Sequence, residues 1–331
     1  MNIALDVMGG DYGPEEILKG AYLFLKENNS HLTLLGKEQL INEGLTNYPF
    51  NREMIEVIDC PDIIDNDAIP TDTLREGKNS PIMVGMDLLK NGKAEAFVSA
   101  GNSGAVMAAA LLKLGCIPGI KRPAIAGIIP TLKGNKVILD MGANVDCKPI
   151  HLLNFALMGA SYARCELGIE QPKVALLNIG EEKSKGNRLS REAYLLLSQR
   201  RDLKFIGNIE GRDIFTGSAD VIVCDGFVGN IVLKTIEGLS EMIMTDFKMN
   251  IFKNIPSNVI TNMLKKKFSD YAKKGSYKSY GGAPLLGING LCFICHGRSK
   301  AETIKNALHS ANLFIERKGL KHLKAVSFES E

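Results

Sequence analysis

Apolar runs that end in glycine-rich turns recur along this chain. Five such runs are IALDVMGGD (Ile3 to Asp11), AFVSAGNSGA (Ala96 to Ala105), VILDMGAN (Val137 to Asn144), VALLNIGEE (Val174 to Glu182) and VIVCDGFVGN (Val221 to Asn230). Each predicts a strand that is buried on both faces, as in a parallel sheet under helices. Ligands of such sheets bind beyond the carboxyl ends of the strands, where these turns would gather. Because a turn that opens a helix points free N–H groups outward, the turns predict one site for an anion.

Helical patterns alternate with these strands. Pro14 with Glu15 and Glu16 is typical of a first helical turn, and Ser80-Pro81 is a second cap followed by proline. Apolar residues also recur at helical spacing after the SAGNS and DGFVGN turns. The alternation of strand, turn and helix predicts a doubly wound α/β fold. No Pro- or Ser-rich linker divides the chain, so we expect residues 1–331 to form a single α/β unit.

Composition narrows the class of protein. The 331 residues are 45% hydrophobic and 23% charged, which is typical of a globular chain with a large core. The net charge of +3 is too small to indicate a nucleic-acid partner. The N-terminus, MNIALDVMGGD, has no basic segment followed by an apolar core, so we expect no signal peptide. No apolar run reaches the length of about 18 residues that a membrane span needs, so we expect a cytoplasmic protein.

The seven cysteines are expected to be reduced and mostly buried. Cys292-Phe-Ile-Cys295-His296 has the spacing of a haem attachment site, but that chemistry requires export. Residues three apart on a strand point to opposite faces, so a structural role is the better interpretation. No spacing typical of metal ligands is present, and we expect neither a metal nor a cofactor.

Two common nucleotide signatures are absent. No two glycines are two residues apart, so there is no G-x-G-x-x-G fingerprint, and no G-x-x-x-x-G-K-[ST] occurs. The best candidate for a phosphate cradle is SAGNSGA. Its glycines permit close backbone approach and its polar side chains can add hydrogen bonds, although an ordinary helix cap would look the same. The candidate phosphate-binding residues are Gly101, Asn102, Ser103 and Gly104.

The remaining turns offer further polar groups. Lys183 and Lys185 follow a strand end, where a lysine can neutralise a phosphate or an oxyanion, but surface loops are also where most lysines lie. Asn230 is placed either to cap the following helix or to donate an amide to an oxyanion. Asn144 lies in LDMGAN, and His296 ends a glycine-rich run that begins near Tyr280.

One segment departs from the α/β pattern. Residues 242–274 are expected to form two helices that meet at KNIPSN, with lysines on both sides. This helical hairpin could pack on a dimer partner, or it could protrude and touch a membrane surface or an apolar substrate. The residues at its apolar tip are Ile251, Phe252, Ile255, Val259, Ile260 and Met263.

Together these stretches resemble the acyl-ACP:phosphate acyltransferase (PlsX) family. The resemblance runs from residue 3 to beyond 310, with the motifs in family order. The matching stretches are DVMGGDYGP (Asp6 to Pro14), SAGNSGA, LDMGAN, NIGEEKSKG (Asn178 to Gly186), FIGNIEGRD (Phe205 to Asp213), DVIVCDGFVGNIVLKTIEG (Asp220 to Gly238) and YGGAPLLGINGLCFICHG (Tyr280 to Gly297).

The resemblance implies an acyltransferase that makes acyl phosphate from long-chain acyl-ACP and inorganic phosphate for bacterial phospholipid synthesis. It implies a three-layer α/β/α fold with a large, mostly parallel sheet, akin to the isocitrate dehydrogenase and phosphotransacetylase group, and a homodimer. Carried onto this chain, it makes Lys185 and Asn230 the catalytic pair, with Asn144 and His296 in support. It also favours peripheral attachment to the inner face of the cell membrane, near the downstream glycerol-3-phosphate acyltransferase.

Three other functions compete with this interpretation. A phosphotransacetylase-type enzyme would use a short acyl-CoA, whereas the apolar hairpin favours a long acyl chain. A dehydrogenase of the related fold would need an acidic metal-binding cluster, which the sequence does not show. A non-catalytic scaffold at the membrane surface would have no need of the polar turn residues.

Overall fold

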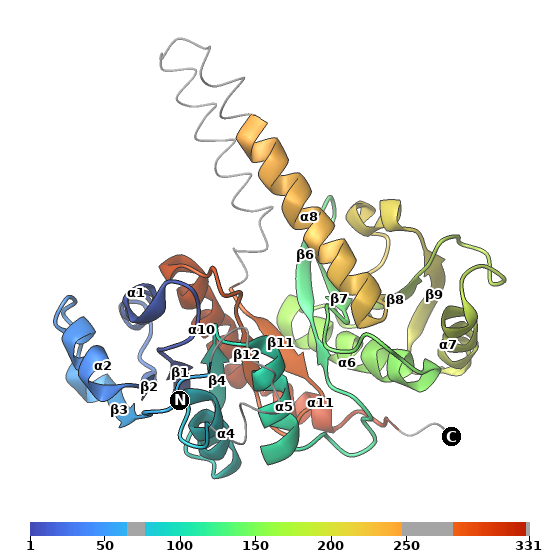
Figure 1. Cartoon of the computed structure of the whole chain (residues 1–331). Coiled ribbons are helices and arrows are strands. Elements are labelled where there is room, and N and C mark those ends of the chain that lie inside the picture. The colour runs from blue at the N-terminus through green and yellow to red at the C-terminus, as the bar shows by residue number, and fades with distance from the viewer. Residues whose placement is uncertain (65–76, 247–280, 329–331) are drawn as a thin grey trace.

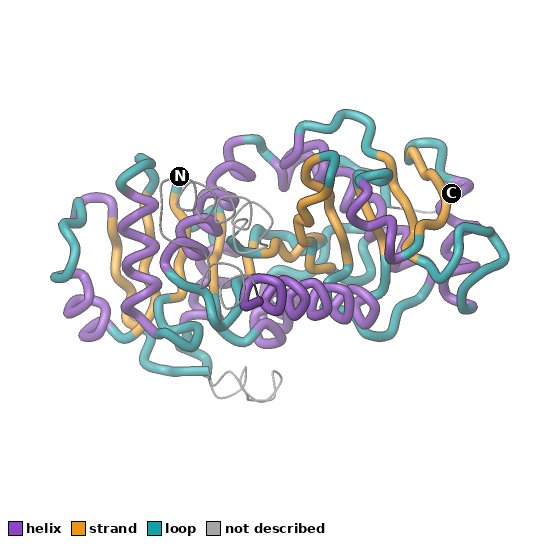
Figure 2. Tube along the Cα trace, turned by 90° about the horizontal axis from the view of Figure 1, so that it is seen from above, coloured by secondary structure: helices purple, strands orange, loops and turns teal. Residues whose placement is uncertain are grey.

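The computed structural model describes residues 1–64, 77–246 and 281–328 (Figure 1). The six apolar tip residues of the expected hairpin, Ile251 to Met263, lie outside this range, as does most of the 242–274 segment. The described strands form two sheets that lie side by side along the molecule (Figure 2).

The first sheet is seven-stranded and contains two of the five predicted strands. Strands β1, β2, β3, β4 and β12 are parallel, whereas β11 is antiparallel to its neighbours β12 and β5. In spatial order the strands are β3 (Ile55–Asp59), β2 (His31–Gly36), β1 (Asn2–Asp6), β4 (Ala96–Ser99), β12 (Cys292–Ile294), β11 (Ala283–Leu286) and β5 (Ala124–Ile125).

The second sheet is five-stranded and contains the other three predicted strands. The hairpin of β6 and β7 is antiparallel, and the remaining pairs are parallel. In spatial order the strands are β6 (Gly127–Thr131), β7 (Gly134–Leu139), β10 (Val221–Val223), β8 (Lys173–Leu177) and β9 (Lys204–Ile209).

The predicted α/β fold with mostly parallel strands is confirmed, but the strands are divided between two sheets. The division occurs within residues 124–131. Ile125 pairs with Leu285 of β11, whereas Gly127 pairs with Ile138 of β7. This run therefore changes partner at Ala126 and joins the two sheets.

Helices cover both faces of the first sheet. On β1, Ile3 and Leu5 point into one apolar cluster and Ala4 into another, because successive side chains alternate between faces. Helices α1 (Gly13–Leu25), α2 (Glu38–Leu45) and α10 (Ala301–Glu316) contribute to the first cluster. Helices α4 (Pro81–Lys90) and α5 (Ser103–Lys113) contribute to the second. The predicted helix starts are confirmed: Pro14 lies in the first turn of α1, and the Ser80 hydroxyl accepts from the Met83 N–H.

The second sheet is layered in the same way. Helix α6 (Pro149–Leu167) is buried over most of its length and packs on β7 and β10, with α7 (Arg188–Gln199) and α11 (Gly319–Lys324) beside it. On the opposite face, Val232 and Ile236 of α8 (Gly226–Asp246) pack against Ile138 and Ile222. Short 3₁₀ helices, η1 (Arg52–Met54) and η2 (Gly211–Thr216), precede β3 and β10. The outer end of α8 projects from the body of the molecule (Figure 1).

Candidate active site

A cleft of about 790 Å³ lies where the carboxyl ends of strands from both sheets come together. It is lined by Ser103 after β4, Met141 and Gly142 after β7, Asn230 on α8 and His296 after β12. Three of the residues predicted from sequence, Ser103, Asn230 and His296, are therefore brought to one place. Asn144 and Lys185 are not among the residues that line the cleft.

A buried carboxylate, that of Asp6, stabilises the SAGNS turn through hydrogen bonds. The Ser99 hydroxyl donates to Asp6 Oδ2 at 2.7 Å and accepts from the Gly101 N–H at 3.0 Å. Asn102 Oδ1 accepts from the Ala105 N–H, so Asn102 is the N-cap of α5. Ser103, the first residue of that helix, is exposed to the cleft. The turn thus presents a helix N-terminus, with its partial positive charge, to the site.

Asp6 also holds its own turn, DVMGG. Its Oδ1 accepts from the N–H groups of Met8 and Gly9 at 3.0 and 3.1 Å. Burial raises the pKa of Asp6, and the hydrogen bonds from Ser99 and the two amides oppose that shift. Gly9 packs directly on the backbone of Gly101, where a Cβ would have no room. Sequence reasoning missed this role of Asp6, although its place at the end of a strand before two glycines was visible.

Asp140 plays the matching part in the second sheet. Its Oδ1 accepts from the N–H groups of Ile125, Gly142 and Ala143, and its Oδ2 accepts from the N–H and the side-chain amide of Asn144. Burial raises the pKa of Asp140, and these hydrogen bonds lower it in part. The Asn144 amide also donates to the Pro123 carbonyl at 2.7 Å. Asn144 therefore shapes the turn instead of facing the cleft.

The LDMGAN loop after β7 also fixes the position of the first turn of α8. The Gly226 N–H donates to the Asn144 carbonyl at 2.7 Å, and Asp225 Oδ1 accepts from the Val228 N–H at 2.8 Å. Asn230 therefore lies inside the helix, so the interpretation of Asn230 as a cap is wrong and Asp225 takes that role. The Asn230 side chain lies next to Gly142, whose φ of +131° suits glycine.

His296 enters the cleft from the other sheet. Its Nδ1 accepts from the Arg298 N–H at 3.0 Å, which leaves the neutral ring with its proton on Nε2. Burial, and then the nearby Lys234 charge, lower the pKa of His296. The ring is thus a neutral donor at pH 7. Its neighbours Cys292 and Cys295 are buried free thiols whose pKa is raised by burial.

Three charged residues of α8 also line the cleft, Lys234, Glu237 and Glu241, and sequence reasoning missed all three. Lys234 Nζ lies 2.9 Å from Glu237 Oε2. These two residues follow Asn230 by four and seven residues, a spacing that places them on one helical face with Asn230. That spacing was the available signal. Arg298 adds a further cation at the cleft.

Lys185 lies on the exposed loop that follows β8. Its carbonyl accepts from the Asn178 side-chain amide at 3.1 Å, and its N–H donates to the Glu182 carbonyl at 3.0 Å. The amine of the neighbouring Lys183 lies over the Tyr194 ring, 5.9 Å from its centroid. The loop therefore holds the Lys185 backbone in place, and Lys183 already has an aromatic partner.

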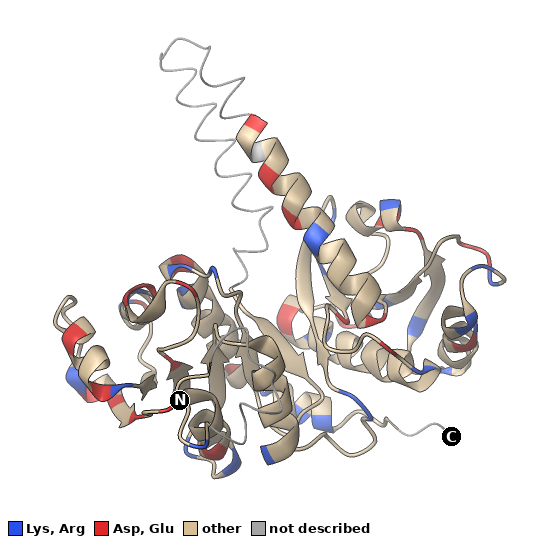
Figure 3. Cartoon of the chain, viewed as in Figure 1, with Lys and Arg blue, Asp and Glu red and all other residues tan. Residues whose placement is uncertain are grey.

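The cleft also has an apolar wall. Its members are contributed by β5, β6, the turn after β7, α8 and β12: Ile125, Ile128, Met141, Leu233 and Ile294. In the view of Figure 3, basic and acidic residues are interspersed over the rest of the molecule. A site that combines an apolar wall with a few polar donors suits a ligand with an apolar part and an anionic part.

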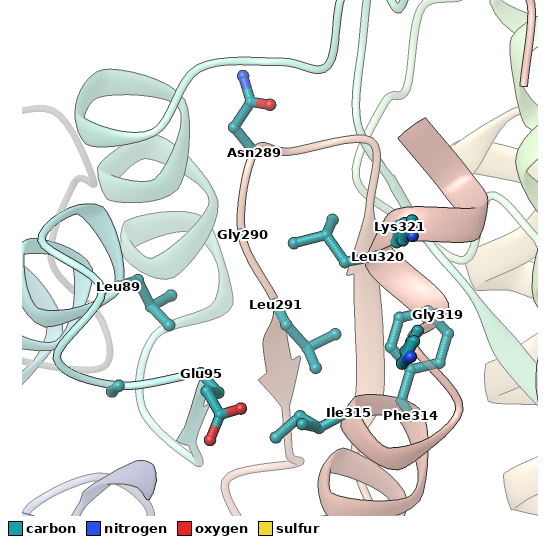
Figure 4. Close-up of a pocket in the computed structure, with 12 residues that line it drawn as sticks. Leu89, Glu95, Asn289, Gly290, Leu291, Phe314, Ile315, Gly319, Leu320 and Lys321 are labelled. Atoms are coloured by element: carbon teal, nitrogen blue, oxygen red, sulfur yellow. The ribbon is translucent and has the colours of Figure 1, made fainter. Parts of the chain in front are cut away.

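A second cavity, of about 280 Å³, lies at the opposite ends of the strands (Figure 4). Leu291 and Ala94, which precede β12 and β4, contact it together with Leu89, Phe314 and Leu320. None of the residues predicted from sequence lines it. Because ligands of parallel sheets bind at the carboxyl ends, the larger cleft is the candidate active site.

Comparison with known proteins shows the family of the chain. The family described as "Fatty acid synthesis protein" matches residues 1–321. The phosphate acyltransferase of Dictyoglomus thermophilum is 48% identical, with 99% of each chain covered. That of Geobacter sulfurreducens is 45% identical over 100% of this chain and 95% of its own. The chain belongs to the phosphate acyltransferase family.

As a phosphate acyltransferase, the chain is an acyltransferase enzyme of the family expected from its motifs. Its fold is shared with a phosphotransacetylase from Streptococcus pyogenes, with a TM-score of 0.65, 20% identity and coverage of 95% of this chain and 94% of that one. The EutD phosphotransacetylase from Staphylococcus aureus gives 0.63 and 18%, with the same coverage. At such identity these structures show the fold alone.

Among the described residues, no helix is both long and apolar enough to cross a membrane. Within the same residues, no three His, Cys, Asp or Glu side chains are grouped so that they could hold a metal ion.

Proposed function

We propose that this phosphate acyltransferase transfers a long-chain acyl group from acyl carrier protein to inorganic phosphate. The observation that carries the proposal is the shared cleft. The N-terminus of α5, the Asn230 amide and neutral His296 meet there beside an apolar wall. These groups suit an anionic nucleophile, a developing oxyanion and a fatty acyl chain.

The reaction needs little from the enzyme beyond placement and charge. A phosphate oxygen of HPO₄²⁻ attacks the thioester carbonyl carbon, so that a C–O bond forms and the C–S bond breaks. The leaving thiolate takes up the proton that phosphate carried, which gives acyl phosphate and free carrier thiol. Both reactants are already activated, so orientation and preorganised donors can supply the acceleration without a covalent enzyme intermediate.

We assign phosphate to the turn of Gly101 to Gly104, where the α5 N-terminus offers N–H groups and a positive dipole end. Asn230 donates to the oxyanion, and Lys185 is its catalytic partner. The assignment of Lys185 rests on its motif, because its side chain is exposed and does not line the cleft. Neutral His296 offers Nε2–H as a further donor, and Asn144 supports the site through Asp140.

The partners follow from the same chemistry. An acidic carrier protein suits the cations at the cleft, Lys234 and Arg298. Ile231, Leu239 and Met242 of α8 are exposed, and an apolar face of this kind supports a homodimer. A labile long-chain product favours release at the membrane surface. We therefore propose that the enzyme attaches peripherally to the inner face of the cell membrane. The downstream glycerol-3-phosphate acyltransferase of phospholipid synthesis would consume the product there.

The deciding experiment measures thiol released from palmitoyl-ACP with and without inorganic phosphate. We expect release that depends on phosphate, with acyl phosphate trapped by hydroxylamine as the hydroxamate. Release without phosphate would identify a thioesterase. Activity with acetyl-CoA in place of palmitoyl-ACP would identify a phosphotransacetylase-type enzyme. No activity with either substrate would favour the non-catalytic scaffold at the membrane surface.

A further inference from the structure

Met141 is the residue of the apolar wall that adjoins the Asn230 amide. It lines the cleft and is half-buried, so a ligand in the cleft can reach it. The next residue, Gly142, lies against the Asn230 side chain, because a Cβ at Gly142 would be 3.5 Å from Asn230 Cβ. Neighbouring Cα atoms are about 3.8 Å apart. The Met141 side chain therefore begins within one residue of the amide that we propose for the oxyanion.

Hydrogen bonds fix the backbone on both sides of Met141. Its own N–H donates to the Ile125 carbonyl at 3.0 Å, and the N–H of Gly142 donates to Asp140 Oδ1 at 3.2 Å. A change in the space around Met141 must therefore be taken up by its side chain. That side chain is unbranched and flexible, so it follows small changes in its surroundings.

Gly127 of β6 supports the Met141 side chain. A Cβ at Gly127 would overlap Met141 Sδ, and its three nearest contacts would all be atoms of Met141. Gly127 does not have the positive φ that requires glycine, so its backbone can accept alanine. Met141 also packs against the apolar cluster that includes Ile138 and Ile222, between the second sheet and α8. Because this cluster lies behind Met141, a methyl group at Gly127 would displace the thioether toward the cleft.

We propose that Met141, positioned by Gly127, sets the width of the acyl path beside the reacting carbonyl, so that the enzyme selects acyl chains without a branch near the thioester. The proposal rests on the proposed function, because it concerns the acyl donor of that reaction. It makes Met141 a specificity-determining residue and Gly127 a positioning residue that acts through Met141.

The place of Met141 explains why the position of a branch is selected. The first carbons of the acyl chain follow directly from the carbonyl carbon, whose oxygen Asn230 binds, so they pass Met141 before the rest of the chain does. A methyl group on C3 would need the volume that the thioether fills, whereas a methyl group near the far end of the chain is remote from it. One methyl group at an apolar wall changes discrimination by about 10–200-fold.

The test measures phosphate-dependent thiol release by the whole enzyme from two isomeric substrates, 3-methylpalmitoyl-ACP and 15-methylpalmitoyl-ACP. The acyl chains contain the same atoms, so the ratio of their kcat/KM values reports only the position of the branch. For the unaltered enzyme we expect the 15-methyl isomer to be preferred by about tenfold or more.

Three variants should move this preference in different directions. Met141→Ala removes the thioether, so the two isomers should be used about equally well. Gly127→Ala displaces Met141 toward the acyl chain, so the preference for the 15-methyl isomer should increase. The double variant has no thioether to displace and should therefore behave like Met141→Ala alone. A double variant that instead keeps the increased preference of Gly127→Ala would overturn the positioning role of Gly127.

Gly44→Ala is the matched control. Gly44 lies in α2, where an added Cβ would overlap Leu18 Cδ1, so this variant also displaces a flexible apolar side chain. Neither Gly44 nor Leu18 is among the residues that line the cleft, and the preference should therefore match that of the unaltered enzyme. A shift of the same size in Gly44→Ala would show that disturbed packing alone changes the preference and would overturn the proposal.

Two further results would overturn it. One is equal kcat/KM of the unaltered enzyme for the two isomers, which needs no variant and decides the matter even where Met141→Ala does not fold. The other is an unchanged preference in folded Met141→Ala. Absence of phosphate-dependent release from palmitoyl-ACP would instead reject the proposed function. Butyryl-CoA and 3-methylbutyryl-CoA would then test the same width in a short-chain enzyme, and no turnover of either would reject both proposals.

Discussion

The Asp140 carboxylate accepts two hydrogen bonds from Asn144, one from its N–H at 2.7 Å and one from its side-chain amide at 2.8 Å. The same amide donates to the Pro123 carbonyl, and the Asn144 carbonyl accepts from the Gly226 N–H. Asn144 thereby ties together the turn after β7, the chain before β5 and the first residue of α8. These are the segments that place Met141, Ile125 and Asn230 around the cleft.

Substitution of Asn144 by Ala should therefore weaken both the fold and the site. It removes one donor from a buried carboxylate and leaves the Pro123 carbonyl unsatisfied, so we expect a loss of about 1–3 kcal/mol in the free energy of unfolding. Urea denaturation measures that loss, and turnover should fall with it. Asn289→Ala is the control, because Asn289 bonds the Cys116 carbonyl at an exposed position. Equal losses in the two variants would contradict the buried network.

The proposed catalytic pair, Lys185 and Asn230, predicts a second set of variants. Asn230→Ala removes a preorganised donor from the oxyanion, and we expect kcat to fall by about 10²–10³ with little change in stability. Lys185→Ala should lower kcat comparably. Lys183→Ala is the control, because the Lys183 amine lies over the Tyr194 ring and its loss should leave turnover nearly unchanged.

These outcomes separate the two lysines of the loop. Near-normal turnover in folded Lys185→Ala would show that its motif position does not make it catalytic. A large loss in Lys183→Ala with none in Lys185→Ala would exchange their roles.

Local pattern predicted the strands, the turns and several helix starts. The strand pattern and the helix starts at Pro14 and Ser80 depend on neighbours in sequence, so they could be predicted directly. The grouping of Ser103, Asn230 and His296 followed from one general property, that parallel strands deliver their carboxyl ends to the same edge. The family resemblance added residue roles and a fold class, but it did not supply the distances between the residues of the site.

The remainder depends on contacts between distant segments. The change of partner at Ala126 is decided by pairing with β11 and β7, which no local pattern encodes. Asp6 and Asp140 look like ordinary strand-end residues until their partners are placed around them. Whether Lys234 and Glu237 face the cleft depends on how Val232 and Ile236 pack α8 against the second sheet.

The lowered pKa of His296 predicts a pH dependence of stability. Burial, and then Lys234, lower the pKa in the folded state below the ordinary 6.5. The unfolded chain therefore binds the proton first, so this contribution to stability is present above pH 6.5 and is lost as pH falls through the folded-state pKa. Asp6 and Asp140, with raised pKa values, act in the opposite direction.

Comparison with His296→Gln isolates the histidine, because both carboxyl groups are present in each protein. Gln can accept from the Arg298 N–H but does not titrate in this range. Between pH 7.5 and 5.5, the free energy of unfolding should fall further in the unaltered protein than in the variant. A difference that stays constant across this range would refute the assignment.

Membrane attachment is predicted from the sequence of residues 242–274. Phe252→Glu with Ile260→Glu should abolish co-sedimentation with phosphatidylglycerol vesicles, because two charges would have to enter an apolar interface. Leu132→Glu is the control: Leu132 is 84% exposed between β6 and β7, far along the chain from that segment. Circular dichroism checks that each variant is folded. Unaltered vesicle binding in the double variant would leave that segment a role in packing only.

Two glycines of α8 provide the sharpest test of the site's construction. A Cβ at Gly229 would overlap the Asp140 carbonyl oxygen, whereas a Cβ at Gly238 would meet nothing within 4 Å. Gly229→Ala should therefore push α8 away from the LDMGAN turn, lower the free energy of unfolding by about 1–3 kcal/mol and displace Asn230, so that turnover falls as well. Gly238→Ala should raise stability by up to about 1 kcal/mol through helix propensity. Both variants add one methyl group to the same helix, so opposite shifts in a urea denaturation curve would show that contact between Gly229 and Asp140 holds the catalytic helix in place. Equal shifts would mean that α8 can move without disturbing the turn.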